Sequence, residues 1–498
     1  MIDRRQTFKN AVLTVAQVAI SAACMFAVYR YMLRALGPGR MGVWSIVMAV
    51  STAARLSDLG FAGGATKFVA KYRALDDSAA VARVIDTATL SLVAFVALIA
   101  AAIYPVTTFV LPNLFEGSRL ADASILFPYS LASFCLLAIG GVFLSSLDGF
   151  QRADQRNAVL IAGTVVYAVL IPVCVSHFGF VGLGYAQLAQ SLLILIAGRV
   201  LVVRAVPGCR LLPFHWSRLA FREMLGYNLN LQVVTFASFL GDPLTKLMLG
   251  RFGSLEMVGF YEMASKMVAQ FRAILINVNQ VLVPVIAHAH EKDKLAVKRL
   301  FEQTYAAVFL ISMTFYGALA MSVPAISGIW LGSYNKFFML GCYMLLLAMQ
   351  LNTLVGPAYF SNLGTGKVRL NSGAQLVIAA FNICVSPVLG LIAGGMGIVV
   401  GYSAAVIAGA LYLVVMFLRA EQYEAGILLS APLRRPVAIG LAVIAVVSTG
   451  SYLTPELPVS VHLAFAVAGV IAVCLVLRRS VAALPFAALI LKRLKPDA

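Results

Sequence analysis

The stretch GDPLTKLMLGRFG places two opposite charges, Asp242 and Lys246, inside an otherwise apolar run. Glu262 and Lys266 follow in the next apolar run with the same spacing. Residues four apart lie on one face of a helix, so each pair can neutralise itself as a structural ion pair. Alternatively, the lysines hold an anionic ligand while the carboxylates carry a coupling proton. Which chemistry applies depends on whether these runs lie in a bilayer and line a cavity.

Arginines add to the charge that the apolar runs carry. Arg55 is three residues from Asp58, and Arg30 and Arg272 lie in other runs. An ionisable group inside a membrane is costly and by default marks a transport pathway. Cations outnumber acids in these runs, which favours an anionic ligand, and the planar donor fork of arginine suits phosphate. The predicted ion-coupling candidates are Asp58, Asp242 and Glu262.

Uncharged hydrogen-bonding side chains gather in the second half of the chain. Amides with aromatic side chains nearby suit a sugar, which offers hydroxyl groups and apolar ring faces. The alternative is that such amides hold neighbouring helices together. These side chains are Asn228, Asn230, Gln232, Asn277, Asn279, Gln280, Gln350, Asn352, Asn371, Gln375 and Asn382. The predicted substrate-binding set comprises the cations and two of the amides: Arg30, Arg55, Lys246, Lys266, Arg272, Asn277 and Asn279.

The composition is that of a membrane protein. Of the 498 residues, 61% are hydrophobic and only 12% are charged, and the mean hydropathy is +0.92. A soluble domain is about half apolar and about a quarter charged. The seven cysteines are scattered, with neither the spacing of a metal site nor a disulfide framework. We therefore expect an all-α polytopic membrane protein.

Apolar segments of roughly 17–25 residues can cross a bilayer as helices. Fourteen such segments occur, at residues 11–36, 42–64, 87–111, 124–147, 158–177, 180–203, 225–250, 258–287, 303–330, 337–362, 371–392, 395–418, 436–454 and 459–477. Outside them, lysine and arginine concentrate on the side of the N-terminus, and only Arg40, Arg119, Arg251 and Lys336 fall on the other side. This bias predicts that both termini are cytoplasmic. It also accounts for the net charge of +18 without a nucleic-acid partner.

The two halves of the chain resemble each other at their glycine turns. LGPGRMGVW at residues 36–44 parallels FGSLEMVGFY at 252–261, and FGFVGLGY at 178–185 parallels GGMGIVVGY at 394–402. The halves start on the same side, so the matches predict parallel repeats related by a pseudo-twofold axis along the membrane normal. The predicted parts are a six-helix lobe at 1–205, a cytoplasmic linker at 206–222, a second six-helix lobe at 223–420, and two additional helices with a basic cytoplasmic tail at 421–498.

The alignment of the repeats also pairs the intramembrane cations. Arg30 meets Lys246, and Arg55 meets Arg272. Each lobe therefore places one cation in its first helix and an arginine in its second. Self-neutralising pairs alone give no reason for such matched positions, whereas a binding site between repeats does.

Catalytic and metal-binding constellations are absent from the sequence. His288 and His290 form a lone HxH without a third ligand nearby, and no glycine-rich phosphate loop ends in lysine and serine. The longest loop predicted on the outer side covers only about residues 112–123, which is short for an enzyme site. We therefore expect no catalytic residue, no metal and no cofactor, and a transporter rather than an enzyme.

Three stretches, LGPGRMGVW, LSDLGFAGGATKFVAKY and GDPLTKLMLGRFGSLEMVGFYEMASKM, resemble the polysaccharide and O-antigen (Wzx-type) flippases of the multidrug/oligosaccharidyl-lipid/polysaccharide exporter superfamily. The resemblance implies a two-lobe helical bundle in the bacterial inner membrane. It also implies that the protein moves an undecaprenyl-diphosphate-linked oligosaccharide to the periplasmic leaflet by alternating access. In this family, cavity-lining cations hold the diphosphate and the sugar, and Arg30, Arg55, Lys246 and Arg272 are the matching positions here. Membrane lipids, a polysaccharide polymerase and export machinery are the candidate partners.

Two other functions stay open on the sequence alone. One is a cation-coupled exporter of drugs or of another lipid-linked precursor; in a drug antiporter acids would have to dominate the cavity. The other is a polytopic glycan polymerase, ligase or acyltransferase, which would need larger outer loops. The excess of cations and the short loops favour the flippase over both.

Overall fold

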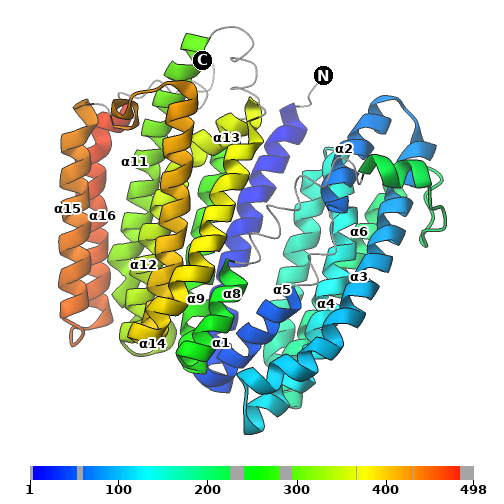
Figure 1. Ribbon diagram of the computed structural model, residues 1–498, viewed down its shortest axis with the longest axis horizontal. Coiled ribbons are helices and arrows are strands. Elements are labelled where there is room, and N and C mark those ends of the chain that lie inside the picture. The colour runs from blue at the N-terminus through cyan, green and yellow to red at the C-terminus, as the bar shows by residue number, and fades with distance from the viewer. Residues whose placement is uncertain are drawn as a thin grey trace. The chain divides into compact units, whose positions relative to one another are not determined.

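The computed structural model contains helices and no strand over the residues it describes, which are 4–52, 60–224, 241–280, 294–365, 367–429 and 431–482 (Figure 1). Within them, nine helical stretches are long and apolar enough to cross a membrane. Three of these stretches contain a helix break and cover two predicted segments each: Leu13–Ser51, Ala153–Ala205 and Val368–Glu421. The expected all-α polytopic membrane fold is confirmed.

The chain divides into two compact units, Met1–Gly259 (unit 1) and Phe260–Ala498 (unit 2). The helices described in unit 1 are α1 (Arg4–Ser51), α2 (Phe61–Ala74), α3 (Ser78–Leu114), α4 (Gly117–Gly149), α5 (Ala153–Phe178), the short turn η2 (Gly179–Val181), α6 (Gly182–Ala205), α8 (Asp242–Phe252) and the start of α9 (Leu255–Gln280). Those described in unit 2 are the rest of α9, α11 (Lys294–Ile326), η3 (Ser327–Leu331), α12 (Lys336–Leu354), α13 (Gly356–Gly364), α14 (Val368–Glu421), η4 (Ala425–Leu428), α15 (Ala431–Leu453) and α16 (Val459–Ala482). The two predicted six-helix lobes, 1–205 and 223–420, have other boundaries than these two units and remain a prediction.

Several helices run beyond the apolar segments that predict them. Helix α2 continues through Lys67, Lys71 and Arg73, and α3 already begins at Ser78. Only Phe115 and Glu116 separate α3 from α4, so the loop expected at 112–123 is wrong. Hydropathy marks the apolar core of a membrane helix, whereas backbone hydrogen bonding continues into the polar flank. The predicted basic tail lies largely outside the described residues.

The repeated glycine turns have the same backbone geometry in both units. Gly179 breaks the helix between α5 and α6 with φ 61° and ψ −137°, and Gly394 breaks α14 with φ 58° and ψ −143°. Positive φ favours glycine because it has no Cβ. Three residues after each break lies another glycine with a close backbone contact. A Cβ on Gly182 would lie 2.3 Å from the carbonyl oxygen of Cys174, and one on Gly397 would lie 1.9 Å from that of Leu389. The sequence match at these turns is therefore a match in structure.

A second pair of matched turns makes a reciprocal contact within unit 1. A Cβ on Gly42 would lie 1.8 Å from the carbonyl oxygen of Leu255, and one on Gly259 would lie 2.4 Å from that of Pro38. An offset of 217 residues maps the first contact onto the second. Such mutual packing is what a pseudo-twofold relation between two turns produces.

Each unit has its own packed interior. In unit 1, α4 packs against α6, α2 and α3, with Phe61, Ile85 and Phe143 in the shared core. In unit 2, Phe301 of α11 stacks on Phe417 of α14 with ring centroids 4.8 Å apart. Helices α15 and α16 lie side by side and pack on α11 (Figure 1). The two additional helices are therefore an integral part of unit 2.

Candidate functional site

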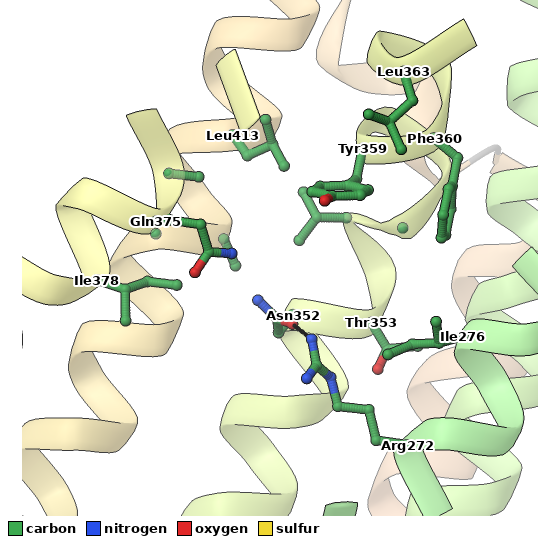
Figure 2. Close-up of a pocket in the computed structure, with 15 residues that line it drawn as sticks. Arg272, Ile276, Asn352, Thr353, Tyr359, Phe360, Leu363, Gln375, Ile378 and Leu413 are labelled. Carbon is green, nitrogen blue, oxygen red and sulfur yellow. Dashed lines mark hydrogen bonds between the residues drawn. The ribbon is translucent and has the colours of Figure 1, made fainter. Parts of the chain in front are cut away.

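Unit 2 contains a cavity of about 340 Å³, lined by α9, α12, α13 and both halves of α14. Its polar lining comes from Arg272, Asn352, Thr353, Tyr359 and Gln375, and Figure 2 shows these side chains around one space. Pockets for small ligands measure roughly 300–1,000 Å³. The cavity therefore has room for one small group, such as a sugar ring or a diphosphate, rather than for a whole oligosaccharide.

Arg272 supplies the positive charge of this cavity. Its Nη2 donates a hydrogen bond of 2.7 Å to Oδ1 of Asn352, drawn as a dashed line in Figure 2. Its Nε is buried and has no hydrogen-bond partner, and within the described parts of the chain no carboxylate forms an ion pair with it. The guanidinium charge is thus oriented by a neutral amide, and no carboxylate of the described residues neutralises it. A cation in this state is suited to an anion that enters the cavity.

Hydrogen bonds behind the cavity hold its lining in place. The Thr353 hydroxyl is 3.0 Å from that of Tyr316 on α11. Asn371 donates to the carbonyl oxygen of Tyr359 at 3.0 Å and accepts from Asn362 at 2.9 Å. Asn362 and Asn371 are almost completely buried, so they join α13 to α14. The amides of this unit therefore divide into helix-joining residues and cavity-lining ones.

The lining is chemically that of a binding site. It combines one cation, two amides, two hydroxyl groups and the rings of Tyr359 and Phe360. Among the described lining residues there is no aspartate, glutamate, histidine or cysteine, and hence no general acid–base pair of the usual kind. The described residues also contain no group of three potential metal ligands. The arrangement can hold a phosphate or a sugar but offers no obvious chemistry on it.

Asp242 and Lys246 form an ion pair of 2.7 Å within α8 in unit 1. The Lys246 side chain is only 5% exposed and that of Asp242 is 35% exposed. Asp242 is the first residue of the helix, where the helix dipole stabilises its negative charge. Pro243 follows in the first turn, where its missing N–H costs no hydrogen bond. The pair thus has a structural explanation, which was one of the two alternatives.

Glu262 and Lys266 form the corresponding pair on α9 in unit 2. Their charged atoms are 3.7 Å apart, with the Glu262 side chain buried and that of Lys266 46% exposed. A buried carboxylate beside an accessible ammonium remains compatible with either a structural or a functional role.

The other predicted site residues lie outside this cavity or outside the described part of the chain. Arg30 lies in α1 and is half-buried. Arg55 and Asp58 lie outside the described residues. Asn277 and Asn279 belong to α9, but their side chains lie outside the described part. Of the predicted substrate-binding set, Arg272 is the member that the described cavity contains.

The sequence interpretation missed a buried ion pair in unit 1. Arg199, near the end of the predicted segment 180–203, is 6% exposed, and its Nη2 lies 3.1 Å from Oδ1 of Asp86. The guanidinium also donates to the carbonyl oxygens of Arg210 and Leu211 in the linker and lies over the ring of Phe143. Arg199 therefore ties the linker to α3 and α6.

Further contacts attach the same linker to unit 1. Trp216 Nε1 donates to Ser91 Oγ at 3.0 Å, and the backbone N–H of Ser217 donates to Thr87 Oγ1 at 3.1 Å. Cys209 is buried there, and this burial raises the pKa of its thiol. The linker is therefore attached to unit 1 at several points, although most of its residues are exposed.

Tyr359 and Thr353 were missed as cavity residues. The pair Gly356-Pro357, with which α13 begins directly after α12, was the available signal. A helix break in a membrane segment is tolerated where it is buried in protein or lines a cavity. Asn352 and Gln375 were recognised as hydrogen-bonding residues but not as site residues. Their assembly requires contacts between helices that the local sequence does not encode.

Solved structures of transporters share this fold. An inward-facing multidrug resistance transporter of the MATE family, in the MOP superfamily, has a TM-score of 0.70 at 13% sequence identity and covers 83% of this chain and 98% of its own. The lipid II flippase MurJ in an inward closed conformation has a TM-score of 0.67 at 13% identity and covers 95% and 99%. The MATE transporter VcmN of Vibrio cholerae in its bent form has a TM-score of 0.54 at 15% identity and covers 83% and 98%. At these identities the likeness concerns the fold.

The family comparison is more specific. No curated protein matches the sequence. Residues 8–290, more than half of the chain, match the family described as polysaccharide biosynthesis protein. The fold is one that a multidrug transporter and the lipid II flippase MurJ share, and the family description names polysaccharide biosynthesis. This protein belongs to the polysaccharide biosynthesis protein family.

Proposed function

We propose that the protein is a flippase for an undecaprenyl-diphosphate-linked oligosaccharide, the repeat unit of a polysaccharide, in the bacterial inner membrane. The observation that carries the proposal is Arg272, which forms no ion pair with a carboxylate of the described residues and lies at a cavity with amide and aromatic walls. The head group of such a lipid combines a diphosphate with sugars, and neither can cross hydrocarbon without partners. A cation and amides inside the membrane can replace the hydrogen bonds that the diphosphate and the sugars make with water.

Two fold-level observations support a flippase over a drug extruder. MurJ covers 95% of this chain, whereas the MATE structure with the TM-score of 0.70 covers 83%. The two additional helices, α15 and α16, provide chain beyond a twelve-helix core. The internal repeat supplies two similar bundles, and alternating access works by moving one such bundle against the other.

The proposal gives the charged residues distinct roles. Arg272, with Asn352 and Gln375, binds the phosphate or the first sugar in unit 2. Arg30, Arg55, Lys246, Lys266, Asn277 and Asn279 remain proposed substrate contacts. Asp58, Asp242 and Glu262 remain the proposed ion-coupling residues.

Reconstitution tests the function directly. The purified protein is placed in liposomes with a fluorescent undecaprenyl-diphosphate-linked glycan, and a membrane-impermeant reductant bleaches the outer leaflet. We expect the protein to make the inner-leaflet pool accessible, while protein-free liposomes keep it protected. Transport of a lipophilic cationic dye in the same vesicles, without movement of the glycan lipid, would replace the flippase by the drug exporter.

The proposed orientation has its own test. Leu212 in the linker is 65% exposed, and Ser118 at the start of α4 is also exposed. In intact cells, an impermeant maleimide should label Ser118→Cys but not Leu212→Cys, which should react only after the membrane is opened. Equal labelling of both variants in intact cells would contradict cytoplasmic termini and linker.

A further inference from the structure

A second, smaller cavity lies at one end of unit 1. It measures about 130 Å³ and is formed by the α2–α3 turn, the α4–α5 turn and the end of α6. Arg73, Asp76, Ser78, Phe150 and Arg152 are among its lining residues. A water molecule occupies roughly 30 Å³ in the liquid, so the cavity holds about four oxygen-sized groups. That is the scale of one phosphoryl group.

The charges around this cavity leave a net cationic site. Arg73 is oriented by a hydrogen bond from Nη1 to the carbonyl oxygen of Phe150 and lies 5.8 Å from the centre of that ring. Arg152 is exposed, and no ion pair joins it to a carboxylate in the described parts of the chain. Asp76 forms no described ion pair with either arginine, while the neighbouring Asp77 instead caps α3 by accepting a backbone N–H at 2.8 Å. The described lining therefore carries two arginines and one aspartate.

Arginine is the side chain best suited to phosphate, because its planar fork donates two parallel hydrogen bonds. Arg73 is already oriented, so little conformational freedom is lost when an anion binds to it. The Ser78 hydroxyl adds a neutral donor. The cavity lies at the end of apolar helices that the charge pattern predicts to be cytoplasmic, which is the depth of lipid head groups.

We propose that this cavity is a phosphoryl-binding site, separate from the transport cavity and independent of the proposed function. Its ligand is a phosphate carried either by an anionic membrane lipid or by a free phosphate compound. Arg73 and Arg152 hold the phosphoryl oxygens between them, and this contact ties the α2–α3 turn to the α4–α5 turn.

Thermal unfolding of the purified protein tests the site, because a ligand of the folded state raises the unfolding midpoint. One arm compares sodium phosphate with sodium chloride at equal ionic strength in detergent. The other compares nanodiscs of phosphatidylglycerol with nanodiscs of phosphatidylcholine. The variants are Arg152→Gln and Arg152→Glu, with Arg83→Gln as the control, since Arg83 is an exposed arginine of α3 outside the cavity.

We expect phosphate or phosphatidylglycerol to stabilise the unaltered protein and Arg83→Gln equally. Arg152→Gln should bind about tenfold more weakly, the effect of losing one charge-assisted contact, and Arg152→Glu should show no stabilisation. A response to sodium phosphate identifies a free phosphoryl group as a sufficient ligand, and a response to phosphatidylglycerol alone identifies the lipid. Equal responses in Arg152→Glu and Arg83→Gln, or no response in either arm, would overturn the proposal.

Discussion

Arg199 in unit 1 and Arg272 in unit 2 are both arginines of largely apolar helices, but their surroundings differ in kind. Arg199 is neutralised by Asp86 and also donates to carbonyl oxygens of the linker. Arg272 has the amide of Asn352 as its described partner and faces a cavity. Each guanidinium keeps one buried nitrogen without a hydrogen bond, Nη1 in Arg199 and Nε in Arg272. The difference therefore lies in charge compensation, and it separates a structural cation from a candidate binding cation.

The largest effect should follow from breaking the Arg199 pair. Arg199→Leu leaves Asp86 buried without its cation, which costs about 3–5 kcal/mol of folding free energy. We expect strongly reduced yield of folded protein and a lower unfolding midpoint. The double variant Asp86→Leu/Arg199→Leu should recover most of the loss, because it leaves no uncompensated buried charge. Thermal unfolding measures both, and a stable Arg199→Leu protein would refute the structural assignment.

Unlike Arg199→Leu, Arg272→Ala should reduce transport of the glycan lipid while leaving the free energy of unfolding nearly unchanged. A charge-assisted hydrogen bond is worth roughly 1.5–3 kcal/mol, so we expect transport to fall by about ten- to a hundredfold. Arg272→Lys should recover part of it, since lysine restores the charge but not the planar fork. The liposome assay and thermal unfolding on the same samples separate the two effects. A large drop in the unfolding midpoint would make Arg272 structural, like Arg199.

Asp242→Asn tests whether a self-neutralised pair also takes part in coupling. The variant removes the ion pair of the buried Lys246 with Asp242. We expect the free energy of unfolding to fall by about 1–3 kcal/mol. If Asp242 carries a coupling proton, gradient-driven transport should vanish while binding of the glycan lipid persists. The test is the rate of gradient-driven transport across a pH range, measured for Asp242→Asn and for Asp58→Asn. Normal transport in both variants at every pH would end the coupling hypothesis and leave the structural pair.

The smallest effect concerns the linker that Arg199 holds. Burial is the main cause that raises the pKa of Cys209; the nearby Arg199 lowers this pKa and Asp86 raises it. Since only the thiolate reacts with maleimide, Cys209 should react slowly at neutral pH. In Asp86→Leu/Arg199→Leu the linker loses its anchor, so lost burial should lower the pKa and speed the labelling. Unchanged labelling would mean that Trp216 and Ser217 suffice to hold the linker.

Much of the fold followed from local patterns in the sequence. Apolar length predicted the helices, and the glycines at 179 and 394 marked breaks whose φ values are positive. The i,i+4 spacing of Asp242 and Lys246 likewise indicated that the two side chains can pair, which was one of the two alternatives, because residues on one helix face meet without tertiary information.

The candidate site followed only in part. Arg272 was predicted from its charge in an apolar run, but its partner Asn352 is 80 residues away on another helix. Arg199 and Asp86 are 113 residues apart, and a charge count at helix ends cannot distinguish a buried arginine from a solvated one. Contacts between distant helices decide both cases, and a local pattern does not encode them.

The central claim is that the cavity of Arg272 binds the diphosphate-linked glycan. The most direct test is equilibrium binding of an undecaprenyl-diphosphate-linked glycan to the purified protein, to Arg272→Ala and to Arg272→Lys. Arg369→Ala is the matched control, since Arg369 is an exposed arginine of unit 2 outside the cavity. We predict about ten- to a hundredfold weaker binding for Arg272→Ala, an intermediate value for Arg272→Lys and unchanged binding for Arg369→Ala. Equal affinity of Arg272→Ala and Arg369→Ala, with both variants folded, would contradict the claim.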